Sequence, residues 1–480
     1  MRVLFLAKMI QDRVLTPYNM YVLSAQCRKA GHETDIVDAV GIRHARRAIK
    51  TFRPDVLAFS THTARWPFFR GAAKRLKEEF GLPQFFGGVH PTFRPNIVEE
   101  PFIDGVCMGE GDEAFPELLD RMEAGKDYRD VANWCFYKDG GMIKNPLRPL
   151  MKNLDNLPVP HFELTDRYHY SRESPLRFFL TSRGCMFCCS FCSTSGYTRL
   201  YGCEGKDYYR KSPVAKVIGE IEYVMKKYPC EFITFFDDHL TRGDEWTLEF
   251  AEAYRKIGGP PFSCHMVVHY IEREEIRALV RAGMRWVGMS LEISDPEFRR
   301  NILNRHYSNE KFKEAVAILS EEGVRTYVGN VIGFPGSTLK QDIESLHLNR
   351  EAGVGLADAS IFTPFPGTPL GERAFKEKLI NEKHFFSRYH SLDASFHGPM
   401  ICDVPHKRYM RRLQCLFEIA GDSGWVARNL RILVRLPLTP LYVLLYKLHN
   451  TAIKRFVLFK GLRLPLQIQL SLLYHNILQI

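Results

Sequence analysis

The chain has 480 residues, of which 45% are apolar and 25% are charged. This length excludes a single small module and allows two or three domains with sizeable cores. The net charge of +11 is concentrated at one end, because residues 424 to 480 contain eight Lys or Arg and no Asp or Glu. The rest of the chain is nearly neutral.

The first 126 residues alternate short apolar strands with helical patterns. Such alternation predicts an α/β, doubly wound (Rossmann-like) domain, in which helices cover both faces of a parallel sheet. Ligands of such sheets bind at the carboxyl ends of the strands. The predicted strands are Arg2–Ala7, Thr34–Val37, Val56–Ser60 and Gln84–Phe86.

Residues 127 to 170 are rich in Pro, Gly and Asn, and we predict a linker there. A second alternating series over 171 to 370 predicts six βα units, a partial TIM-type barrel with its function at the carboxyl ends of the strands. Residues 371 to 480 are predicted to be helical and basic. The predicted barrel strands are Arg177–Thr181, Phe232–Phe236, Phe262–Val267, Trp286–Leu291, Thr326–Ile332 and Ala359–Phe362.

Four of the twelve cysteines lie within eight residues, directly after the first barrel strand: Cys185, Cys188, Cys189 and Cys192. No signal-peptide pattern precedes the fold-like sequence, so we expect a reducing cytoplasm and no disulfide framework. Closely spaced thiolates bind zinc or an iron–sulfur cluster. No second pair with zinc-finger spacing follows, which favours the cluster, although a zinc knuckle stays open. Either Cys188 or Cys189 can complete the ligand set.

The stretch Arg183-Gly184-Cys185-x-x-x-Cys189-x-Phe191-Cys192 resembles the signature of the radical S-adenosylmethionine (SAM) family. The resemblance implies that Cys185, Cys189 and Cys192 bind a [4Fe-4S] cluster whose fourth iron chelates SAM. It makes Cys188 a spare residue. We expect Phe187 and Phe191 to shield the cluster from water.

Segments at the ends of the second, fourth and fifth barrel strands also resemble this family. The resemblance implies that Glu292 contacts the ribose or amino group of SAM, that Arg305 grips its carboxylate, and that backbone near Gly333 holds its adenine. A helix cap at Asp238 and a solvated charge at Arg305 are the alternatives. The predicted SAM-binding residues are Asp237, Asp238, Glu292, Arg305, Ile332 and Gly333.

Residues 363 to 370 are similar to one branch of the family, which carries a cobalamin-binding domain in front of the barrel, and motifs before residue 160 match that domain in order. A histidine ligand to cobalt is not expected, because Lys8 to Arg13 contains no histidine. A relic sheet without corrinoid is the alternative, and His62 and His90 also fit packing roles. The predicted cobalamin-binding residues are Ser60, Thr61, Gly87, Gly88, His90, Gly109 and Glu110.

The basic end of the chain contains two uncharged runs, Leu436–Tyr446 and Leu464–Ile480. Crossing a bilayer takes about 20 predominantly apolar residues, so we expect these runs to lie on a membrane rather than to cross it. Helices that pack on the barrel are the alternative. Nucleic-acid binding is not expected, because aliphatic side chains outnumber the aromatic ones that stack on bases.

The resemblance implies an enzyme that forms a 5′-deoxyadenosyl radical and, with cobalamin, methylates an unactivated carbon. We expect a hydrophobic substrate (a lipid, an isoprenoid or a tetrapyrrole), an external one-electron reductant of the flavodoxin or ferredoxin type, and a peripheral location on the inner face of the cytoplasmic membrane. One alternative is oxidative cyclisation or carbon–carbon coupling without methyl transfer. Another is a zinc-binding, membrane-associated protein.

Overall fold

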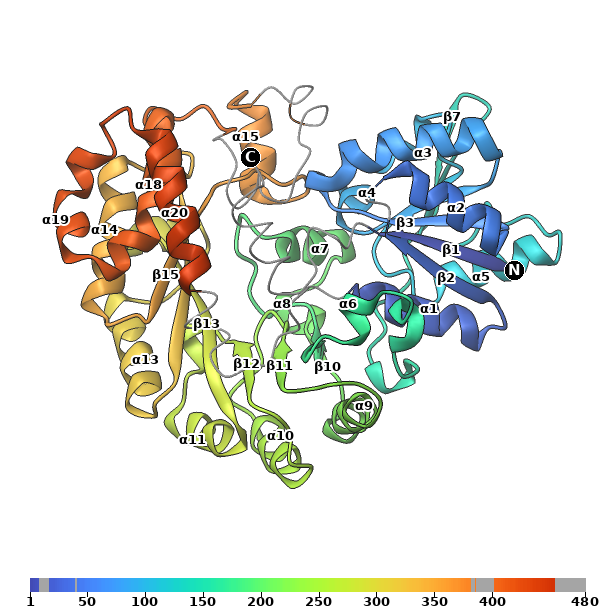
Figure 1. Cartoon of the computed structure of the whole chain (residues 1–480). Coiled ribbons are helices and arrows are strands. Elements are labelled where there is room, and N and C mark those ends of the chain that lie inside the picture. Colours follow the sequence, from blue (N-terminus) through green and yellow to red (C-terminus); the bar gives the residue numbers. More distant parts are fainter. Residues whose placement is uncertain (8–16, 39–40, 381–384, 386–400, 454–480) are drawn as a thin grey trace. The chain divides into compact units, whose positions relative to one another are not determined.

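The structure is a computed structural model that describes residues 1–7, 17–38, 41–380, 385 and 401–453 (Figure 1). These residues form two units. The first comprises Met1–Arg172 and Gly196–Glu204, and the second comprises Glu173–Ser195 and most of the described residues from 205 onward. The segment from Lys8 to Arg13, where we looked for a cobalt-binding histidine, lies outside the described residues.

The first unit contains a seven-stranded sheet in the order β2-β1-β3-β4-β5-β6-β7. One face packs on α2 and α3, where Phe69 contacts Phe59, and the other packs on α5, where Phe115 contacts Phe5. The predicted doubly wound domain is therefore confirmed. Its parallel strands are β1 (Arg2–Ala7), β2 (Glu33–Asp38), β3 (Val56–Ser60), β4 (Gln84–Gly87) and β5 (Gly105–Cys107). Its main helices are α1 (Tyr18–Lys29), α2 (Ile42–Phe52), α3 (Trp66–Phe80), α4 (Val89–Phe93) and α5 (Ala114–Glu123).

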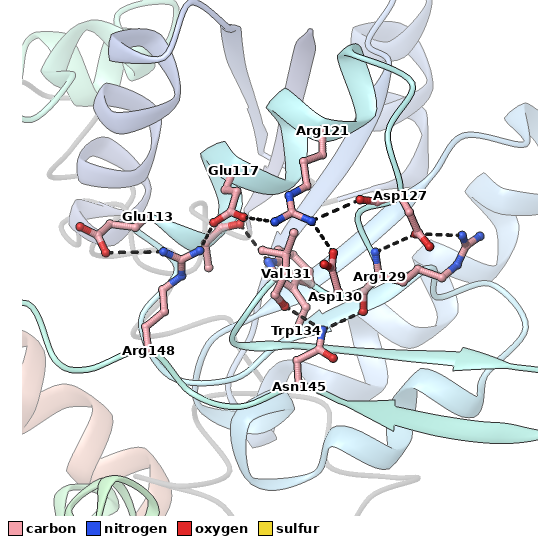
Figure 2. Close-up of polar contacts among 11 residues, drawn as sticks. Glu113, Glu117, Arg121, Asp127, Arg129, Asp130, Val131, Trp134, Asn145 and Arg148 are labelled. Atoms are coloured by element: carbon pink, nitrogen blue, oxygen red, sulfur yellow. Dashed lines mark hydrogen bonds and ion pairs between the residues drawn. The ribbon is translucent and has the colours of Figure 1, made fainter.

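The segment from 127 to 170 differs from the expected irregular linker. It forms the antiparallel strands β6 (Trp134–Lys138) and β7 (Gly141–Lys144), which make the sheet mixed rather than wholly parallel. Figure 2 shows how this segment is attached to α5: the Arg148 guanidinium donates to the Glu117 carboxylate, and the Arg121 guanidinium donates to the Asp130 carboxylate. The segment thus belongs structurally to the first unit, and the proposed domain boundaries remain a prediction.

The second unit contains six parallel strands in the order β15-β14-β13-β12-β11-β8, which confirms the predicted parallel series. A short hairpin of β9 (Ser182–Arg183) and β10 (Arg210–Lys211) follows the first strand. The strands are β8 (Leu176–Phe179), β11 (Phe232–Phe235), β12 (Phe262–His265), β13 (Met284–Glu292), β14 (Arg325–Ile332) and β15 (Leu356–Ile361). Helix α7 (Ser193–Tyr201) begins in this unit, but its residues from Gly196 onward belong to the first unit. The helices of the second unit are α8 (Gly205–Tyr208), α9 (Val214–Lys227), α10 (Glu245–Lys256), α11 (Arg273–Ala282), α12 (Pro296–Asn301), α13 (Asn309–Glu321), α14 (Leu339–Glu351) and α15 (Pro369–Lys376).

Three further helices follow, of which α18 packs on the sheet while α19 and α20 pack on α18. They are α18 (Lys407–Asp422), α19 (Gly424–Leu433) and α20 (Thr439–Ile453). Helix α18 lies against the edge strand β15, and the Gln414 side chain donates to the Ala359 carbonyl over 3.1 Å. Within the described part of the chain, no helix is both long and apolar enough to span a bilayer. The predicted run Leu464–Ile480 lies outside the described residues.

Candidate active site

The cysteine-rich loop connects the short strand β9 to helix α7. It begins with Gly184, whose φ of +81° lies in the left-handed region that favours glycine. A Cβ at this position would lie 2.6 Å from the Tyr208 carbonyl oxygen. The glycine of the signature therefore allows the loop to pass close to the neighbouring backbone.

Two other loops of the same unit hold the cysteine loop in place. The Asn304 side chain, which follows β13, donates to the Cys188 carbonyl over 2.9 Å. The Ser190 hydroxyl donates to the Ile302 carbonyl over 2.6 Å, and the Leu370 amide donates to the Ser190 carbonyl over 2.8 Å. The backbone of the loop is thus fixed from the carboxyl ends of the fourth and sixth strands.

The three predicted ligand thiols lie within electrostatic reach of one another. Burial raises the pKa of Cys185 to about 12 and that of Cys189 to about 11, so these thiols need a positive partner to ionise. A single tetrahedral zinc, with Zn–S bonds of about 2.3 Å, requires sulfurs roughly 3.8 Å apart. Among the described residues, no cysteines form a group of three whose sulfurs all lie within 4.8 Å of one another.

Two aspartates follow β11, and their surroundings differ. Asp237 is buried, and its carboxylate accepts hydrogen bonds from the Thr181 amide at 2.9 Å and from the hydroxyls of Thr181 and Ser182. This arrangement positions the strand that leads into the cysteine loop. Asp238 keeps contact with solvent although protein atoms surround it, and this desolvation together with the charge of Asp237 raises the pKa of Asp238 to about 6. Its charge acts on Cys185. Asp238 is not a helix cap, because α10 begins at Glu245.

Glu292 and Arg305 form an ion pair at the carboxyl end of β13, with the Arg305 Nη1 atom 2.7 Å from the Glu292 Oε1 atom. Glu292 is 5% exposed, and its backbone has a φ of +67°, a strained conformation that is typical of functional positions. Arg305 also donates to the Ser290 carbonyl over 3.1 Å. The alternative of a solvated Arg305 is therefore wrong. The charges of both residues act on Cys189, which places the pair beside the cysteine loop.

The two predicted residues after β14 are already bonded within the protein. The Ile332 side chain is fully buried, and its carbonyl accepts from the Phe362 amide over 2.9 Å. The Gly333 amide donates to the Asp342 carboxylate over 3.1 Å. Asp342 in turn lies 3.0 Å from the His406 ring. This geometry assigns the two residues to the support of the loop, and their contact with SAM stays a prediction.

The two aromatic residues of the cysteine loop, Phe187 and Phe191, pack against different sets of rings. Phe187 lies 5.0 Å from the His269 ring and 6.0 Å from that of Tyr270, centroid to centroid. Phe191 meets Phe334 edge to face at 5.6 Å. Both rings are partly buried by these contacts, and the shielding of the cluster from water stays a prediction.

In the first unit, the structure brings together the loops that follow β3, β4 and β5. The Thr61 amide donates to the Gly87 carbonyl over 2.9 Å, and the Thr92 hydroxyl accepts from the Gly109 amide over 3.1 Å. The Thr92 hydroxyl also donates to the Gly88 carbonyl over 2.8 Å. Small and polar residues therefore line the carboxyl edge of this sheet, which fits a large polar ligand such as a corrinoid.

Protein packing accounts for several residues that the sequence assigned to cobalamin. A Cβ on Gly88 would lie 2.7 Å from the Thr61 carbonyl oxygen, and one on Gly109 would lie 2.1 Å from the hydroxyl of Tyr201. His90 is 2% exposed and stacks on Trp66, and burial lowers its pKa to about 3. This favours the packing role for His90. The side chain of Ser60 accepts from Asn19 over 2.8 Å, and the Glu110 amide donates to Tyr201 over 3.1 Å.

Two family models match the chain. The Radical SAM superfamily matches residues 179–348, and the B12 binding domain matches residues 12–119. The chain is a member of the radical SAM superfamily with a B12-binding domain. As in other B12-binding radical SAM enzymes, its cofactors are a [4Fe-4S] cluster, SAM and cobalamin, and it needs a reductant. The alternative of a zinc-binding protein in place of a radical SAM enzyme is therefore wrong.

This radical SAM enzyme is similar to several known proteins. An uncharacterized methyltransferase of Pyrococcus horikoshii is 26% identical over 76% of this chain and 79% of its own. An anaerobic magnesium-protoporphyrin IX monomethyl ester cyclase of Rubrivivax gelatinosus is 27% identical over 71% of this chain, but the match spans only 63% of the cyclase. The fold is similar to that of the radical SAM methyltransferase TsrM from Kitasatospora setae, with a TM-score of 0.63, 16% identity, and coverage of 79% of this chain and 77% of that one.

Sequence reasoning missed the residues that support this radical SAM site. Asn304 and Ser190 hold the cysteine loop through contacts that span more than 100 residues of sequence. Asn304 has a φ of +53°, and asparagine tolerates this left-handed region better than most residues. The asparagine itself is therefore a weak sequence signal for a special backbone position. The contact of Tyr201 with Gly109 could not be predicted, because no sequence pattern links the two residues.

Replacing Gly184 with alanine is expected to lower the free energy of unfolding by at least about 3 kcal/mol, because the new Cβ adds a clash with rigid backbone to the strain of a positive φ. Gly202→Ala is the matched control. Its φ is +62°, but its Cβ would meet nothing within 4 Å, so only about 1 kcal/mol is expected. Denaturant unfolding of both variants checks this, and equal losses would contradict the role given to Tyr208.

Proposed function

We propose that this enzyme methylates an unactivated carbon of a hydrophobic substrate, such as a lipid, an isoprenoid or a tetrapyrrole. One observation supports methyl transfer most directly, namely the match with a protein named as a methyltransferase over more than three quarters of both chains. The hydrophobic nature of the substrate is supported by the apolar, acid-free end of the chain. The relative named for magnesium-protoporphyrin IX monomethyl ester also acts on a tetrapyrrole.

In this proposal each part of the site has a separate task. When bound, the cluster and SAM supply a radical that removes hydrogen from carbon, and cobalamin supplies the methyl group. Cys185, Cys189 and Cys192 hold the cluster, and the Glu292–Arg305 pair orients the polar groups of SAM beside it. Phe187 and Phe191 keep water away from the loop.

A second candidate is oxidative cyclisation without methyl transfer. The similarity to the Rubrivivax gelatinosus cyclase favours it, although that match covers less than two thirds of the cyclase. The two candidates predict different fates for the methyl group of SAM.

Turnover with methyl-labelled SAM separates these candidates. The anaerobically purified protein is incubated with a reductant, cobalamin and a lipid extract of the source cells, and the products are analysed by mass spectrometry. Methyl transfer is expected to place the label in a hydrophobic product, with formation of 5′-deoxyadenosine. A changed hydrophobic product without label would overturn methyl transfer and favour cyclisation or coupling.

We further propose a location in the cytoplasm, peripheral on the inner face of the cytoplasmic membrane, and a flavodoxin or ferredoxin as the reductant. The cluster of closely spaced free thiols and the absence of a predicted disulfide framework support a reducing compartment. The basic, apolar end of the chain supports proximity to an anionic leaflet, from which a hydrophobic substrate is delivered.

A further inference from the structure

The helices α19 and α20 expose an unusual amount of apolar surface. Fifteen large apolar side chains are exposed among the described residues, and eight of them lie between 425 and 448. Scattered exposed leucines are ordinary in proteins, but a contiguous apolar group marks an interaction site. We call this group the apolar face. It consists of Trp425, Ile432, Leu436, Leu438, Leu441, Leu444, Leu445 and Leu448.

The apolar face of α20 points away from its own fold. The helix buries Tyr442 and Tyr446, and the Tyr442 hydroxyl donates to the Leu433 carbonyl over 3.0 Å. Leu441, Leu444 and Leu448 lie at helical spacing and are 46%, 52% and 52% exposed. These leucines therefore contribute little to the packing of the second unit, and their exposure calls for a partner.

The charges around the apolar face indicate which partner. Arg428, Arg431 and Arg435 are exposed on and after α19. No Asp or Glu occurs from residue 424 to the end of the sequence. The aliphatic residues, the single tryptophan and the three exposed arginines are the composition of an interfacial helix on an anionic bilayer.

We propose that α19 and α20 dock on an anionic lipid surface through the apolar face, with Arg428, Arg431 and Arg435 at the lipid headgroups. The inference rests on the proposed membrane location and identifies the surface of the protein that would bind the membrane. Apolar side chains enter the boundary between headgroups and acyl chains, while the arginines bind phosphates. This docking would hold the second unit next to the leaflet that supplies the substrate.

The full-length protein is tested by co-sedimentation with vesicles of phosphatidylcholine alone or mixed with phosphatidylglycerol. Leu444→Gln with Leu448→Gln is expected to weaken binding by about tenfold or more for each leucine. Neutralising Arg428, Arg431 and Arg435 as glutamines is expected to weaken binding to the anionic vesicles roughly a hundredfold, at about fivefold for each charge. A variant in which the same three arginines are replaced by lysines should retain most of the binding to anionic vesicles. Leu248→Gln on α10, which is 37% exposed, is the matched control for a lost surface leucine.

Trp425 provides a second measurement. It is 61% exposed, so brominated lipids are expected to quench its fluorescence, and Trp425→Phe removes the quenched signal. Wild-type protein that does not bind anionic vesicles would overturn the proposal, as would binding that the leucine and arginine variants leave unchanged. So would a change of the protein from dimer to monomer in the leucine variant, because a second copy would then cover the face. Vesicle binding needs no turnover, so its failure leaves the methyl-transfer proposal standing, and the reverse also holds.

Discussion

Replacing Cys189 with alanine is expected to remove the iron–sulfur cluster and reduce cleavage of SAM to background, while Cys188→Ala keeps both. Cys189 is buried beside Arg305 and shares its electrostatic surroundings with Cys192, and the resemblance to the radical SAM signature predicts that it is a ligand. Loss of a partner in the outer shell of a metal site typically costs about 10- to 100-fold in affinity or activity, and loss of a ligand costs more.

The measurement is iron and sulfide content after anaerobic purification, together with formation of 5′-deoxyadenosine from SAM and a reductant. Cys188→Ala is a matched control, because the two cysteines are adjacent in the loop but only Cys189 is predicted to bind the cluster. A Cys188→Ala protein without cluster, beside a Cys189→Ala protein that retains it, would reverse the ligand assignment.

Replacing Arg305 with methionine is expected to lower the free energy of unfolding by about 3–5 kcal/mol, because Glu292 would remain buried without its counter-charge. Burial raises the pKa of Glu292 in the native protein, and Arg305 opposes that rise. In the variant the folded-state pKa lies further above the unfolded value. Folding then favours the protonated acid, so the loss of stability should shrink as the pH falls toward that pKa.

Urea unfolding of the apoprotein over a series of pH values tests this prediction. The double variant Glu292→Gln with Arg305→Met removes both charges, so it should be more stable than Arg305→Met at neutral pH and show no such dependence on pH. If the free energy of unfolding of Arg305→Met lay within about 0.5 kcal/mol of the wild-type value, the ion pair would contribute little to stability.

The regular strands were predictable because each is a short apolar run between turn residues. All four predicted strands of the first sheet and all six of the second are present, with boundaries that differ by a few residues. The strand β5 was missed because it has only three residues. The hairpin of β6 and β7 was missed although Asp139-Gly140 is a strong turn signal, because its strands are half exposed and lie in a segment rich in Pro and Asn.

The candidate site was predictable where the chemistry lies in one motif. The cysteine loop, Glu292 and Arg305 lie together as expected, but the alternatives at Asp238 and Arg305 needed burial and contacts to be decided. The glycines near the B12-binding sheet were harder to interpret. Gly88 and Gly109 make room for backbone and for a tyrosine, and a sequence pattern cannot distinguish such packing from the close approach of a ligand.

The packing of α18 on β15 has a consequence for shortened forms of this enzyme. An uncovered edge strand is a template for pairing with other chains, and β15 is the edge of the second sheet. Helix α18 covers that edge, and the Gln414 side chain occupies one of its carbonyls. Helix α18 therefore prevents β15 from pairing with a strand of another chain. Fragments that end before this helix are expected to aggregate during purification, whereas a truncation that removes only the basic end from residue 424 onward keeps α18.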